Sequence, residues 1–121
     1  NTPFYLYYKD ALKPFFEQKF EYLFDFNTQL TLTLLKALQV DAKVECTKTF
    51  SHYEENDLRL EIHPKKARRP DYRYALKEPY YQVFEDKFGF SPNLSVIDLL
   101  FNEGLQATTY LHHLAQTLVT L

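Results

Sequence analysis

The sequence predicts a mainly α-helical protein with one short strand, and three observations support this. Apolar residues recur at three- and four-residue spacing over residues 21–39 and 105–118, which is the period of a helix with one buried face. The only two glycines, Gly89 and Gly104, each follow a helical pattern at the point where a left-handed residue ends a helix. One segment, 44–50, alternates apolar and polar residues, as a strand does.

The N-terminal region predicts two short helices, over residues 3–10 and 12–18. Pro3 suits a first helical position, whereas Pro14 removes a backbone donor and clashes with the preceding turn, so a single long helix is not expected. The first of these helices is rich in aromatic residues, namely Phe4, Tyr5, Tyr7 and Tyr8. We interpret them as core residues, because an aromatic stripe at helical spacing belongs to the core more often than to a binding site.

The longest helix is predicted over residues 21–39, where Leu23, Phe26, Leu30 and Leu34 follow a helical period. The run LTLTL at 30–34 also alternates like a strand, and threonine favours strands. We favour the helix because the flanking residues extend the 3.6-residue period in both directions.

Segment 44–50 is the only strand that the sequence predicts. A lone strand leaves its backbone groups unpaired. We therefore expect its partner to be a missing N-terminal segment or a second chain.

Residues 79–104 contain clear start and stop signals for two further helices. The first runs over residues 79–88, with Pro79 at a first helical position and Gly89 after its end. The second starts at Ser95, whose hydroxyl is expected to cap the N–H of Asp98, and it ends at Gly104. A last helix is predicted over 105–118.

The chain has 121 residues, a net charge of −2 and one cysteine, Cys46. The length predicts a single domain or a C-terminal fragment of a longer protein; because the chain begins at Asn1 and contains no Met, we expect a fragment or a processed chain. The charge gives no overall preference for nucleic acid or membrane, and no apolar run approaches the ~20 residues of a spanning helix. A single cysteine excludes an internal disulfide and fits a reducing compartment, so we expect a cytoplasmic location.

The densest charge feature is a basic run of four residues: Lys65, Lys66, Arg68 and Arg69. Such side chains on a loop can hold phosphates, Arg through a bidentate fork, which suits a phosphorylated sugar or a nucleotide-sugar. A solvated surface loop is the alternative. Nucleic-acid binding is a further alternative, because Tyr72 and Tyr74 could stack on bases.

His63 directly precedes the basic run and is a candidate general base, because neighbouring cations favour its neutral form. The alternative is a purely structural histidine. Tyr81 and Gln82, on the next predicted helix, are candidates for lining the same cleft. The sequence contains no metal-ligand spacing and no glycine-rich phosphate loop, so no metal or cofactor is expected.

Four stretches of the chain resemble the WbqC-like protein family: YYKDALKPFFEQKFEYLFDFN, DLRLEIHPKK, YYQVFEDKFGF and NLSVIDLLFNEG. Family members are longer, with a strand-rich N-terminal half, so the resemblance implies the helical C-terminal half of an α+β protein. It also implies a role in bacterial surface-polysaccharide (O-antigen type, lipopolysaccharide) biosynthesis, with a transferase acting on a nucleotide-linked sugar as the favoured activity. It assigns no catalytic residues. A non-catalytic interaction or scaffold protein of the same pathway, and a nucleic-acid binder through the basic run, remain as alternatives.

Overall fold

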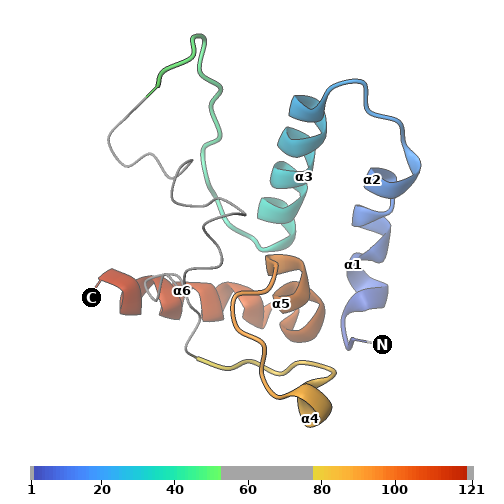
Figure 1. Cartoon of the computed structure of the whole chain (residues 1–121), viewed down its shortest axis with the longest axis vertical. Coiled ribbons are helices and arrows are strands. Elements are labelled where there is room, and N and C mark those ends of the chain that lie inside the picture. The colour runs from blue at the N-terminus through green and yellow to red at the C-terminus, as the bar shows by residue number, and fades with distance from the viewer. Residues whose placement is uncertain (1, 53–77, 120–121) are drawn as a thin grey trace.

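The computed structural model describes residues 2–52 and 78–119 of the chain. Within these ranges it contains six helices and no strand: α1 (Tyr5–Leu12), α2 (Pro14–Glu17), α3 (Leu23–Ala37), α4 (Glu85–Phe88), α5 (Val96–Glu103) and α6 (Gln106–Val119). Figure 1 shows α2 and α3 above α5 and α6, α1 beside α5, and α4 on a loop at the lower end. The predicted mainly helical fold is confirmed.

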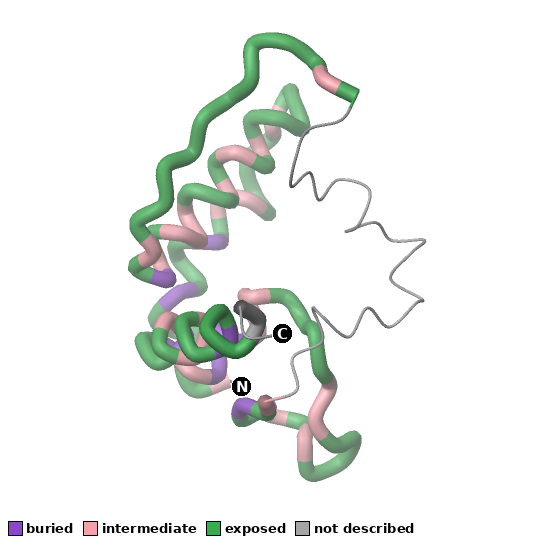
Figure 2. Tube along the Cα trace, turned by 90° about the vertical axis from the view of Figure 1, so that its left-hand side faces the viewer, coloured by how far each residue is buried: buried purple, intermediate pink, exposed green. Residues whose placement is uncertain are grey.

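The core lies where α5 and α6 meet α1 and the end of α3, and Figure 2 shows the buried positions gathered there. Its buried members come from segments far apart in the sequence, and they are Tyr8, Leu38, Tyr80, Leu99, Leu100 and Ala107. Leu100, the most deeply buried large side chain, is 1% exposed. α1 contacts both α3 and α5, and α5 contacts α6. α5 therefore joins the N-terminal helices to α6, through its contact with α1.

The aromatic stripe of α1 is only partly in this core, so its interpretation as a core stripe was too broad. Tyr8 is buried, whereas Phe4, Tyr5 and Tyr7 are exposed to 38%, 46% and 74%. An eight-residue helix that packs along one side cannot bury side chains that point in several directions. These three exposed rings can therefore contact a ligand or line a cavity at the surface.

The strand predicted over 44–50 is wrong: no strand occurs among the residues that the structure describes, and every residue of 41–50 is exposed. Figure 2 shows this exposed segment between α3 and the part drawn in grey. The side chains of Lys43 and Glu45 form an ion pair at 2.6 Å. An alternating pattern favours a strand only when a second strand accepts its backbone hydrogen bonds, and residues 2–52 and 78–119 offer none.

The break between α1 and α2 confirms the two short helices predicted around Pro14. Pro14 is the first residue of α2, and Lys13 serves as the cap between the helices. The ring of Phe15 stacks on Phe20 with centroids 5.9 Å apart and meets the edge of Phe26 at 5.7 Å. These ring contacts attach α2 to the start of α3.

The helix predicted over 21–39 is confirmed as α3, and the alternative strand at 30–34 is not formed. No residue of α3 is fully buried. Just after the helix, buried Leu38 accepts a hydrogen bond from the hydroxyl of Thr108 on α6 through its backbone carbonyl. α3 is thus held at its start by the rings around Phe26 and at its C-terminal end by Leu38.

The predicted start of α5 is confirmed, but its capping differs in detail. The Ser95 hydroxyl accepts a hydrogen bond from the N–H of Ile97 at 3.2 Å, not from Asp98. The Asp98 N–H instead donates to the Ser95 carbonyl at 2.9 Å. The Asp98 carboxylate accepts from the Tyr80 hydroxyl at 2.6 Å, so a tertiary contact replaces the expected capping box.

The helix predicted over 79–88 is limited to its last turn, α4. Tyr80 and Gln82 are both buried, whereas Tyr81 between them is exposed. This alternation is that of an extended segment, and side-chain contacts to more distant residues hold it. The helix predicted over 105–118 is confirmed as α6. No helix in the described part of the chain has the length and apolar character needed to cross a membrane.

Candidate functional site

The residues predicted to bind anions, Lys65, Lys66, Arg68 and Arg69, lie outside the described residues, as does His63. Both candidates for cleft lining are described. Tyr81 is 51% exposed, and its backbone N–H donates to Glu103 Oε1 at 3.2 Å. Gln82 is buried, and its amide both donates to the Ser91 carbonyl and accepts from the Ser91 N–H, each at 2.9 Å. Of the two, only the Tyr81 side chain is available to a ligand.

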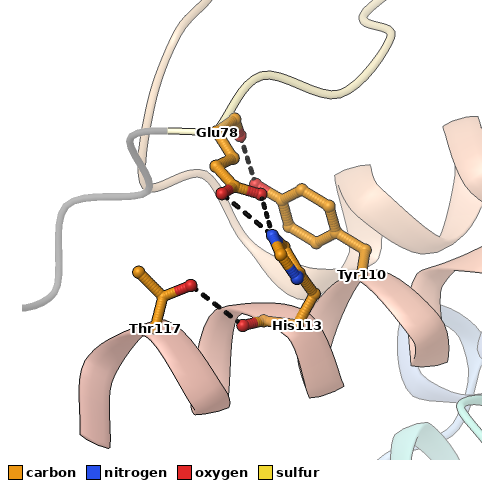
Figure 3. Close-up of polar contacts among 4 residues, drawn as sticks. All are labelled: Glu78, Tyr110, His113 and Thr117. Atoms are coloured by element: carbon orange, nitrogen blue, oxygen red, sulfur yellow. Dashed lines mark hydrogen bonds and ion pairs between the residues drawn. The ribbon is translucent and has the colours of Figure 1, made fainter. Parts of the chain in front are cut away.

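Glu78 is the first residue of the second described range, 78–119. Both its side chain and its backbone bind α6 (Figure 3). Its carboxylate lies 2.8 and 2.9 Å from His113 Nε2. Its carbonyl accepts a hydrogen bond from the Tyr110 hydroxyl at 2.5 Å. The carboxylate–histidine pair is about half exposed, so it contributes little to stability, but together with Tyr110 it fixes the position of the chain here.

The hydroxyls of buried Tyr80 and partly buried Tyr110 hold the segment that begins at Glu78 in place. Burial, the hydrogen bond to Asp98 and nearby acidic charge raise the pKa of Tyr80 above its usual value. Burial, followed by the negative charges of Glu78 and Glu103, raises the pKa of Tyr110. Both hydroxyls therefore stay protonated at neutral pH and act as hydrogen-bond donors, which is a structural role.

A cavity of about 570 Å³ lies between α1, α2, α3 and α5, and Glu78 does not line it. Its apolar lining consists of five aromatic and three aliphatic side chains: Tyr5, Phe15, Phe16, Phe26, Phe101, Leu12, Leu30 and Ile97. The rings of Tyr5 and Phe101 meet edge to face at 5.6 Å and join α1 to α5. The volume falls in the range of roughly 300–1,000 Å³ that is typical of small-molecule sites.

Four charged residues complete the cavity lining: Lys9, Asp10, Lys13 and Glu17. The ammonium group of Lys13 lies 3.6 Å from the Glu17 carboxylate, and both side chains are well exposed. The lining therefore combines a mainly apolar wall with two positive and two negative groups. This combination can pack against the flat face of a ligand and hydrogen-bond with its polar edge.

This cavity was not predicted from the sequence. The available signal was the aromatic density of residues 4–8 and the alternation of charge over Lys9, Asp10 and Lys13. Its completion by Ile97 and Phe101 depends on packing between segments that are distant in sequence. Within 2–52 and 78–119, no group of three or more His, Cys, Asp or Glu side chains could hold a metal ion.

The described residues form a mainly helical fold with an open, aromatic-lined cavity. A comparison with protein families matches residues 1–74 to the WbqC-like protein family. The chain belongs to the WbqC-like protein family. The match includes α1, α2, α3 and the basic run. It ends before α4 and α5, so the resemblance of YYQVFEDKFGF and NLSVIDLLFNEG to the family stays a prediction. Searches of curated proteins and of solved structures found no match.

Proposed function

We propose that this chain acts in bacterial surface-polysaccharide biosynthesis of the O-antigen type, as a transferase acting on a nucleotide-linked sugar. Membership of the WbqC-like family supports the pathway. The observation on which the activity depends is that the basic run at 65–69 lies inside the matched residues 1–74. A nucleotide-sugar carries a diphosphate, and Lys and Arg are the side chains that bind such groups.

In this proposal the basic run binds the diphosphate and His63 acts as the general base that activates the acceptor hydroxyl. We propose Tyr81, whose side chain is exposed, as a further contact of the same ligand. The attachment of Glu78 to His113 and Tyr110 supports the proposal because it fixes the chain shortly after the run. We place the activity in the cytoplasm, where an exposed thiol such as Cys46 stays reduced.

Calorimetry on the full chain with UDP-glucose, GDP-mannose and dTDP-glucose tests this function. We expect Lys65→Ala combined with Lys66→Ala to weaken binding by more than about tenfold, since each charged hydrogen bond contributes roughly 1.5–3 kcal/mol. Lys19→Ala combined with Lys48→Ala is the matched control, because both lysines are exposed and lie outside the run. Equal affinity of the two double variants would refute the phosphate site.

His63→Gln separates catalysis from binding. If His63 is the base, turnover of the bound nucleotide-sugar falls while its affinity stays unchanged. The same titrations test the two alternatives. If no nucleotide-sugar binds, the scaffold function is favoured. If oligonucleotides bind with an affinity that falls steeply with salt, the nucleic-acid-binding function is favoured.

A further inference from the structure

The cavity between α1, α2, α3 and α5 has an aromatic ring that no neighbouring ring covers. Phe16 lines the cavity and is 87% exposed. The other rings of the lining pack against one another or against Phe20. Phe16 takes part in no ring contact among the described residues. Its face is therefore free to pack against a flat apolar surface of a ligand.

The charged part of the lining restricts the chemistry of that ligand. Lys9 and Lys13 are balanced by Asp10 and Glu17, and Lys13 is already close to Glu17. Two cations beside two anions give no net attraction for a phosphate. A purely apolar chain would make no hydrogen bond with any of these four exposed groups. A neutral ligand with many hydroxyl groups satisfies both kinds of group, because a hydroxyl donates to a carboxylate and accepts from an ammonium.

We propose that this cavity binds an uncharged sugar ring. A pyranose has an apolar face of C–H groups, which packs on Phe16, and an edge of hydroxyls, which bind Asp10, Glu17 and the two lysines. The volume of about 570 Å³ holds one to two such rings together with ordered water. The site depends on the cavity alone, so it stands whether or not the basic run binds a diphosphate. Under the proposed transferase function, the sugar bound in this cavity is the acceptor saccharide.

Saturation-transfer NMR on the full chain, with the methyl glycosides of glucose, galactose, mannose and N-acetylglucosamine, detects the contact. We expect the ring protons of at least one glycoside to receive saturation from the protein. Binding should change little between 50 and 500 mM salt, because an uncharged ligand gains nothing from screened charges. Binding at the proposed diphosphate site should weaken as salt rises. The two proposals can therefore be tested independently of each other.

Two pairs of variants locate the site. Phe16→Ala should lower the affinity for the glycoside about tenfold. Phe88→Ala, which removes a comparably exposed ring in α4, should leave that affinity unchanged. Asp10→Asn should weaken binding, whereas Asp86→Asn, an exposed aspartate of α4 outside the cavity, should not. Thermal denaturation checks that all four variants fold. The proposal is overturned if no glycoside binds, or if Phe16→Ala and Phe88→Ala bind equally well.

Discussion

Gly104, at the end of α5, is the position where a single methyl group should disturb the fold most clearly. Its backbone has φ +58° and ψ −126°, a conformation that residues with a Cβ rarely adopt. A Cβ built here would lie 2.7 Å from Cδ1 and Cε1 of Phe4 and 2.9 Å from its Cγ. Carbon atoms in contact normally stay about 3.5–4.0 Å apart. Gly104→Ala therefore forces both a strained backbone and a displaced ring.

The expected loss is the sum of these two effects. The backbone strain costs about 1–3 kcal/mol, and the displaced ring adds about 1–3 kcal/mol. Reduced freedom of the unfolded chain returns roughly 0.4–1 kcal/mol. The net loss of about 1–6 kcal/mol is a large part of the 5–15 kcal/mol by which a typical domain is stable.

Gly89 provides the control for the strain. It also has a positive φ, +71°, yet a Cβ there would meet no atom within 4 Å. Gly89→Ala should therefore show the strain alone. In the Phe4→Ala background, Gly104→Ala should cost less stability, because the truncated side chain no longer collides with the new methyl group.

Urea denaturation followed by circular dichroism measures the parent and four variants: Gly104→Ala, Gly89→Ala, Phe4→Ala, and Phe4→Ala combined with Gly104→Ala. With a slope of about 1–3 kcal/mol per molar urea, the midpoint of Gly104→Ala should fall by at least about 0.3 M, and clearly further than that of Gly89→Ala. The reasoning would be refuted by equal midpoint shifts for the two glycine variants, or by additive effects of Phe4→Ala and Gly104→Ala.

Three further predictions follow from the polar contacts. Ser95→Ala removes the N-cap bond to Ile97 and should lower the free energy of unfolding by about 1 kcal/mol; Ser95→Asp should retain most of it, and an unchanged urea midpoint for the alanine variant would contradict the cap. Because the pKa of Tyr80 is raised in the folded state, its contribution to stability is fully present below the unfolded value of about 10 and declines as pH rises above it, by up to about 1.4 kcal/mol per pH unit. Tyr80→Phe should therefore be less stable at pH 8 yet show a flatter profile between pH 10 and 11, and parallel profiles would exclude this effect. Gln82→Ala leaves both backbone groups of Ser91 without their partners and should cost about 2–3 kcal/mol, seen as faster exchange of the Ser91 amide proton; unchanged exchange would show that the amide pair is not formed.

The positions of the helices were largely predictable from the sequence, because their ends depend on local chemistry. Pro14 separates α1 from α2 for reasons contained in its own ring. Ser95 and Gly104 mark the limits of α5 through a side-chain cap and a positive φ. The anion-binding chemistry assigned to residues 65–69 likewise rests on side-chain type and stays a prediction.

Tertiary contacts decided the rest, since they join residues that no local pattern relates. Asp98 bonds to Tyr80 instead of capping its own helix, and the segment around Gln82 is extended because Ser91 satisfies its amide. Alternation at 44–50 could not produce a strand without a second strand beside it. The cavity exists only because α5 brings Phe101 against Tyr5, across almost the whole length of the chain. Its aromatic residues were visible in the sequence, but whether a ring is buried or faces an open cavity depends on which distant helix packs against it.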